Sequence, residues 1–198
     1  LWQICDSGLP TGGFAHSAGL EAAVDQGIVR AKHPGSLIRF VRGALANASA
    51  LQLPLLTVAF KADSLDAWLE VDSVAHACIT GEAARRASLA QGAGLLRATQ
   101  AMFPLGEQFG RMLGDFRALV RDGVVSTAPH HPTGSRKRSA RGHQAPAFGV
   151  VCRALGIGEC EAARAFMYLV ARDVLSAATR QAARGSRQCL LRPTKPDS

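Results

Sequence analysis

The residues with the clearest chemical potential lie near the start of the chain, in the pentapeptide Ala15-His16-Ser17-Ala18-Gly19. This pattern is one residue away from G-x-S-x-G, in which a strained strand-to-helix turn presents a nucleophilic serine. The motif requires a strand before the serine, whereas Leu-Pro-Thr-Gly-Gly precedes it here. A serine hydrolase that uses Ser17 is therefore an alternative, and the favoured interpretation places His16 and Ser17 on a polar helix face.

Metal and nucleotide chemistry find less support in the sequence. The candidate ligands are the adjacent His130 and His131, the pair His76 and Cys78, and the pair Cys152 and Cys160. None of these spacings suits ligands on one face of a helix or a zinc ribbon. There is no Gly-Lys dipeptide, which excludes a P-loop. We predict no metal site and no cofactor, and we expect Cys78 and Cys152 to be small buried apolar side chains.

The net charge of +8 is concentrated in two segments. Residues 126–147 carry Arg136, Lys137, Arg138 and Arg141 with no acid, and residues 180–198 carry Arg180, Arg184, Arg187, Arg192 and Lys195 against Asp197. We expect a flexible basic loop over residues 126–145 and a disordered basic tail over residues 181–198. A nucleic-acid-binding helical protein is a second alternative. The loop lacks interleaved aromatic residues for base stacking, so nucleic acid is not the expected partner.

The elements that must position these residues are predicted to be helices. Alanine and leucine are abundant, isoleucine and threonine are scarce, and apolar residues recur at helical spacing. Helices are predicted at about residues 14–26, 34–48, 54–60, 66–81, 82–101, 109–120, 146–155 and 159–180, and no strand is predicted. The predicted fold class is all-α, a single-domain multi-helix bundle over residues 1–180.

Two features bear on the compartment. The uncharged stretch Gly43–Phe60 contains Asn47, Gln52 and Pro54, so we interpret it as two core helices that meet at the proline rather than as a membrane span. The five cysteines form no C-x-x-C pair. This argues against a disulfide framework and favours a reducing, cytoplasmic location.

The most specific motif is LPTGGFAHSAGLE, residues 9–21. A proline, two glycines and a helix start without catalytic context favour a docking surface, so we expect the Gly12-Gly13 turn to serve partner binding more than folding. The segment resembles the N-terminal signature of the urease accessory protein F (UreF) family, close to LP-x-GG(F/Y)-x-x-S-x-GLE. The matching residues are Pro10, Gly12, Gly13, Phe14, Ser17, Gly19, Leu20 and Glu21, and His16 stands where the family often has a larger aromatic residue.

A second stretch, residues 146–156, is similar to the family's P-x-x-FG…LG helix and contains Phe148. The long helix through Phe166, Tyr168 and Arg172 also resembles that of the family. The resemblance covers about residues 1–125 and 146–180. Residues 127–142 look like an insertion, and beyond Thr179 the chain departs from the family pattern.

The resemblance implies an all-α, often homodimeric protein that is not an enzyme and binds no metal itself. Such a protein forms a complex with UreD (also called UreH) and the GTPase UreG, and the complex delivers nickel to apo-urease. This chain would act as adaptor, GTPase regulator and chaperone of metallocentre assembly, with no membrane partner, and its changed C-terminus would weaken the UreD contact. The implied partner-binding residues are Pro10, Gly12, Gly13, Phe14, His16, Ser17, Gly19, Glu21, Phe148, Tyr168 and Arg172.

Overall fold

The computed structural model describes residues 2–6, 8–9, 12–13, 16–30, 33–122, 124–125 and 138–190. The elements are α1 (Trp2–Cys5), α2 (Leu20–Asp25), α3 (Pro34–Asn47), the π-helical turn η2 (Ala48–Gln52), α4 (Leu53–Phe60), α5 (Leu65–Cys78), α6 (Glu82–Met102), α7 (Glu107–Asp122), β1 (Val124–Val125), β2 (Arg138–Ser139), α8 (Gln144–Ala154) and α9 (Glu159–Leu190). The predicted all-α class is confirmed. Within the described ranges, β1 and β2 form a single antiparallel pair of two residues each.

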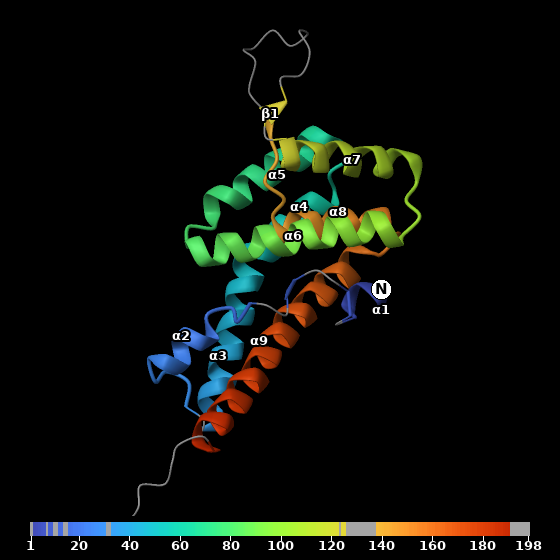
Figure 1. Cartoon of the computed structure of the whole chain (residues 1–198). Helices are drawn as coiled ribbons and strands as arrows, with labels where there is room; N and C mark the ends of the chain where they lie inside the picture. The colour runs from blue at the N-terminus through green and yellow to red at the C-terminus, as the bar shows by residue number, and fades with distance from the viewer. Residues whose placement is uncertain are drawn as a thin grey trace, which may run out of the picture.

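The core forms where α4 and α8 pack together, with α5, α6 and α7 around them (Figure 1). All residues of α8 from Ala145 to Cys152 are buried. A Cβ at Gly149 would overlap the carbonyl oxygen of Leu56, so only glycine allows the two backbones to approach this closely. This glycine therefore sets the separation of the two central helices.

Aromatic pairs join the outer helices to this centre. Trp68 of α5 stacks on Phe116 of α7 with ring centroids 3.7 Å apart and an interplanar angle of 5°. Phe148 of α8 meets Phe166 of α9 edge to face, with centroids 5.4 Å apart. All four rings are almost fully buried. Such pairs contribute about 0.5–1.5 kcal/mol each beyond their burial.

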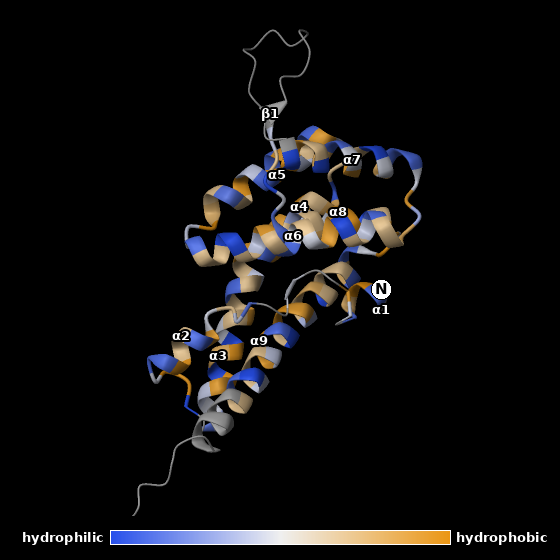
Figure 2. Ribbon diagram, in the orientation of Figure 1, coloured by the Kyte–Doolittle hydropathy of each residue, from blue (hydrophilic) through white to orange (hydrophobic). Residues whose placement is uncertain are grey.

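An arm made of α2, α3 and the C-terminal part of α9 extends away from the bundle (Figure 1). Its small core consists of Leu20, Ala23, Val29 and Ala177. No residue of α3 is buried, and Ile38 remains 59% exposed. Figure 2 shows hydrophobic segments of α3 and α9 alternating with hydrophilic ones along this arm. The arm therefore leaves large apolar side chains such as Ile38 in contact with solvent.

The prediction that two separate helices meet at Pro54 is wrong, because the helix is not interrupted there. α3, η2 and α4 form one continuous helix, in which the N–H of Leu53 bonds to the carbonyl of Ala48, five residues back. Proline has no N–H and its ring crowds the carbonyl four residues before it. A π-helical turn just upstream of Pro54 relieves this conflict without ending the helix.

This continuous helix, Pro34–Phe60, has the length and hydropathy of a membrane span, and 22% of its most apolar window is buried. A soluble helix can meet the same criteria. Its α4 half packs in the core, where Leu55, Leu56 and Ala59 are buried, as the prediction of core helices required. The α3 half of the helix has no buried residue and does not pack in this core.

The two basic segments are more ordered than predicted. Residues 138–145 of the expected flexible loop form β2, a packed turn and the start of α8, while residues 126–137 lie outside the described residues. α9 continues to Leu190, so the helix occupies ten residues of the expected disordered tail. Alanine, arginine and glutamine have high helix propensity, and propensity sustains a helix that begins in a packed region even without an apolar period.

Candidate partner-binding surface

The N-terminal segment is held against α9 by Arg172. Its Nη1 donates to the carbonyl oxygen of Cys5 at 2.8 Å, and its Nε and Nη2 both donate to Asp173 Oδ1, at 3.1 and 2.8 Å. The side chains of Arg172 and Asp173 are 19% and 16% exposed. The planar guanidinium donates several hydrogen bonds in fixed directions. Arg172 therefore holds α1 against α9, and we call this contact the clamp.

Gly13 lies buried beside the same clamp. A Cβ at this position would overlap Oδ2 of Asp173 and stand 3.2 Å from its Cγ. Because Arg172 holds this carboxylate, it cannot turn away freely. The geometry argues against the expectation that the Gly12-Gly13 turn serves docking more than folding, since Gly13 packs inside the molecule.

Residues 16–19 form a turn rather than the predicted first half of a helix. Ala18 and Gly19 have left-handed φ values of 49° and 85°, and α2 begins at Leu20. Two successive left-handed residues cannot continue a right-handed helix, which moves its start six residues beyond the predicted Phe14. His16 and Ser17 are therefore half-buried turn residues and not part of a polar helix face.

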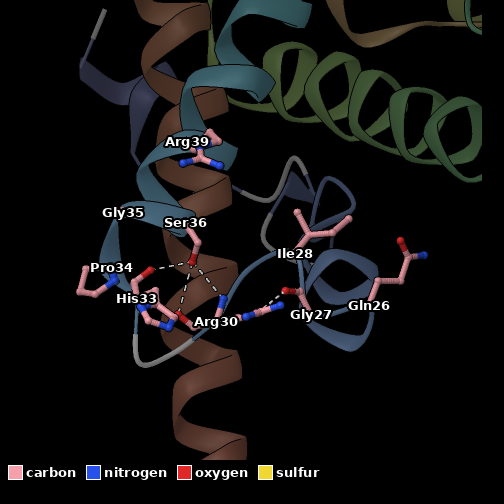
Figure 3. Close-up of a pocket in the computed structure, with 9 residues that line it drawn as sticks. All are labelled: Gln26, Gly27, Ile28, Arg30, His33, Pro34, Gly35, Ser36 and Arg39. Carbon is pink, nitrogen blue, oxygen red and sulfur yellow. Dashed lines mark hydrogen bonds between the residues drawn. The ribbon is translucent and has the colours of Figure 1, made fainter.

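The turn after α2 and the first half of α3 border a shallow, open cleft of about 840 Å³ (Figure 3). Hydrogen bonds fix its floor: Arg30 N donates to Ser36 Oγ at 2.9 Å, Ser36 Oγ donates to the carbonyl of His33 at 2.6 Å, and Arg30 Nε donates to the carbonyl of Gly27 at 2.8 Å. Ser36 thus links the backbone of Arg30 to that of His33.

A second cavity of about 360 Å³ adjoins the first and shares Ile28, Ser36 and Arg39 with it. Ala18 lines it from the 16–19 turn, opposite α3 residues from Phe40 to Asn47. The two cavities form one groove, which we call the α2–α3 groove. The sequence motif therefore reaches this groove through Ala18.

The remaining predicted site residues divide by exposure. Glu21 and Tyr168 are exposed, Tyr168 at 55%, whereas Phe148 is 1% exposed and belongs to the core. Pro10 and Phe14 lie outside the described residues. The structure does not gather these residues into one site: the N-terminal motif lies on the arm and along α9, and Phe148 lies inside the bundle.

A polar cluster that the sequence did not reveal lies between α5 and the segment before α8. Asp72, which is fully buried, accepts hydrogen bonds from the backbone N–H groups of Arg141, Gly142 and His143 at 2.6, 3.0 and 2.8 Å. A carboxylate with three such donors is well satisfied. A Cβ at Gly92 of α6 would overlap the Gly142 carbonyl, so α6 also presses on this segment.

The cluster continues through His143. Its Nδ1 lies 3.1 Å from Ser88 Oγ, and its Nε2 lies 3.1 Å from His76 Nδ1. Burial lowers the pKa of both imidazoles, assisted by the charges of Arg141 and Arg85 and opposed by Asp72. The pair is therefore held neutral at physiological pH. The cluster holds the segment before α8 against α5 and α6, and we interpret its role as structural.

The cysteines differ from one another in exposure. Cys152 is fully buried, and burial raises the pKa of its thiol to about 12. The expectation that Cys78 is buried is wrong, because it lies exposed at the end of α5, where the helix meets solvent. Among the described residues, no three His, Cys, Asp or Glu side chains are arranged to hold a metal.

Comparison with known proteins identifies the scaffold. The family model described as UreF matches residues 31–188. The chain is 38% identical over 180 residues to urease accessory protein F of Oryza sativa subsp. indica, covering 90% of this chain and 61% of the relative. It is 34% identical over 179 residues to urease accessory protein F of Arabidopsis thaliana (90% and 66%) and 35% identical over 182 residues to urease accessory protein UreF of Paenarthrobacter aurescens strain TC1 (91% and 70%).

An all-helical scaffold with these similarities defines a non-catalytic accessory protein. The chain belongs to the UreF family of urease accessory proteins. This membership decides against the serine hydrolase, and Ser17 in its turn is not a nucleophile elbow. The chain spans about three fifths of the length of the rice relative.

The family match also corrects the expected departure at the C-terminus. It continues to residue 188, close to the end of α9 at Leu190, instead of stopping near Thr179. Residues 181–188, interpreted as part of an unrelated tail, thus lie within the family match and within α9. The match begins at residue 31, so it does not include the N-terminal motif of residues 9–21.

Proposed function

We propose that this chain is the adaptor that bridges the GTPase UreG and UreD (UreH) in the complex that inserts nickel into apo-urease, and that it regulates GTP hydrolysis by UreG. The observation that carries the proposal is membership of the UreF family. In this assignment the partners bind the nucleotide and the nickel, and this chain provides the surfaces to which the partners bind.

Exposed side chains on two elements support an adaptor role. Tyr168 and Leu175 of α9 are 55% and 49% exposed, and Ile28 beside α2 is 62% exposed. Tyrosine is enriched at binding hot spots because it combines a large apolar area with a polar end. These residues lie along the arm and its base, well placed for partners to bind without disturbing the bundle core.

The partner-binding residues divide accordingly. We assign direct contacts to Gly12, His16, Ser17, Gly19, Glu21 and Tyr168, which are exposed or half-buried. Gly13, Phe148 and Arg172 support binding indirectly, because they hold the N-terminal segment and α8 in place. A homodimer and a cytoplasmic location complete the proposal, in accord with Cys5, Cys78, Cys152 and Cys160 being free thiols.

The test is reconstitution with purified cognate UreG, UreD and nickel-free urease. The chain should co-elute with UreD and recruit UreG in size-exclusion chromatography, and urease activation by nickel should require it. Tyr168→Ala should weaken the complex while circular dichroism and melting temperature stay near wild type.

Val74→Ala provides the matched control, since Val74 is a similarly exposed apolar residue on α5. It should bind as the wild type does. Failure of the wild-type chain to bind either UreG or UreD would refute the adaptor assignment.

A further inference from the structure

We propose that the α2–α3 groove is a docking site for an acidic, apolar segment of a partner protein. The inference rests on the proposed adaptor function and deepens it by assigning the chemistry of one partner segment. It is carried by the shape and the charge of the groove and by the hydrogen bonds along its wall.

The shape suits a polypeptide segment. The two adjoining cavities, of about 840 and about 360 Å³, run along the exposed side of α3. Gly43 and Ala44 leave room in the narrower part, and a Cβ at Gly43 would meet no other atom within 4 Å. Ile28, 62% exposed, and the half-buried Phe40 provide apolar contact area. An inserted apolar side chain would cover surface that is otherwise in water.

The charged side chains that line the groove, Arg30 and Arg39, are both basic. His33 also lines it, and no aspartate or glutamate does. The helix Pro34–Phe60 contains no acidic residue at all. Within the described part of the chain, Arg39 forms no ion pair. Carboxylates on the occupant would therefore complement the wider end of the groove, because paired opposite charges favour and orient association.

The groove is also pre-organised. Ser36 Oγ bonds to the backbone of Arg30 and of His33, and Arg30 Nε donates to the Gly27 carbonyl. On the opposite wall Ala18 keeps a left-handed φ of 49°, which is uncommon for a residue with a side chain. Such strained conformations persist where the surrounding structure holds them, often at binding sites. Groups that hydrogen bonds already hold in place lose less entropy on binding.

Nucleic acid fits this groove less well than a protein segment does. Phe40 is the one Phe, Tyr or Trp among the lining residues, and it is half-buried, so the groove provides no platform on which successive bases could stack. The combination of an apolar part and a basic part instead matches a peptide that carries both apolar and acidic side chains.

The first experiment fills or reverses the groove in the full chain and measures affinity for purified cognate UreG and UreD by isothermal titration. Gly43→Trp should occupy the narrow part, and Arg39→Glu should repel carboxylates. Each should lower the affinity for one of the two partners at least about tenfold, as expected when a central contact is lost.

Two variants control for the substitutions themselves. Gly114→Trp places the same side chain on α7, where a Cβ also meets nothing within 4 Å, and Arg42→Glu reverses an exposed charge on α3 outside the groove lining. Both should bind like the wild type. Circular dichroism and melting temperature of all four variants should show an intact fold.

The second experiment identifies the occupant. p-Benzoylphenylalanine at position 43 should cross-link, on irradiation, to a peptide of UreG or UreD that contains aspartate or glutamate next to apolar residues. A cross-link to a neutral or basic peptide, to a second copy of this chain or to nothing would overturn the proposal.

The two levels of the proposal fail in different ways. If the wild type binds both partners and the groove variants bind as tightly as their controls, the groove assignment is wrong and the adaptor function stands. If the wild type binds neither partner, both are wrong.

Discussion

Arg172 Nη1 donates a hydrogen bond of 2.8 Å to the carbonyl oxygen of Cys5, which joins α9 to α1. The residues are 167 positions apart in sequence. Arg172 matches the family's long helix in the sequence, and its position shows that such a residue can matter because it holds the N-terminal motif in place.

Replacing Arg172 should release the N-terminal segment. Arg172→Gln keeps helix propensity but removes the guanidinium, so we expect a loss of about 1.5–3 kcal/mol in the free energy of unfolding, typical of a hydrogen bond to a charged group. Urea denaturation measures the loss, and limited proteolysis should cut the chain faster before residue 20. The exposed Arg164 on the same helix supplies the control Arg164→Gln, which should change neither.

Gly13→Ala should destabilise the protein by about 1–3 kcal/mol, since the added methyl overpacks against Asp173. The variant Gly114→Ala, in open space on α7, should be neutral or slightly stabilising. A double-mutant cycle with Asp173→Ala tests the cause, because removing the carboxylate should relieve most of the penalty of the methyl group. Additive effects of the two substitutions would contradict the proposed contact.

Asp72→Ala should be among the most damaging single substitutions in the chain. It leaves three backbone N–H groups before α8 without an acceptor, and we expect a loss of about 3 kcal/mol or more. Thermal and urea unfolding, together with hydrogen exchange of residues 141–143, measure the effect. Glu70→Gln, at an exposed position of the same helix, should leave both unchanged.

The stability should fall on acidification because of His143 and His76. Both have an ordinary pKa of 6.5 in the unfolded chain and a lowered pKa in the fold. Between these values the unfolded state binds more protons, so the free energy of unfolding decreases as the pH falls below about 6.5 and levels off below the folded pKa. Urea titrations at several pH values measure this slope, which the double variant His76→Gln/His143→Gln should flatten. A wild type that becomes more stable on acidification would show that the sign is wrong.

Helix type and approximate position followed from sequence wherever an apolar stripe faces a core. The spacing of Phe109, Met112, Leu113 and Phe116 predicts α7, and three of these four residues are buried. The interruptions were harder to predict. Pro54 has the usual properties of a helix boundary, and the continuous helix depends on a hydrogen-bond pattern that one extra residue makes possible.

The candidate site shows the same division. The motif LPTGGFAHSAGLE was recognisable from residue types, but its surroundings were not, because Asp173 and Cys5 are brought to it only by the folded chain. The basic segment before α8 has no periodic pattern of apolar residues, and this absence predicts a loop. It is ordered by one carboxylate, Asp72, about seventy residues away. Spacing arguments detect ligands on one helix and do not detect partners that only tertiary structure brings together.

The π-helical turn Ala48–Gln52 sets the angular phase between the two halves of the long helix. An α-helix rotates by about 100° per residue, so a chain one residue shorter here would keep α4 seated against α8 and turn α3 by roughly a quarter of a revolution. Arg39 and Gly43 would then face away from Ile28. The orientation of the groove therefore depends on the number of residues in the π-helical turn, although none of these five residues lines either cavity.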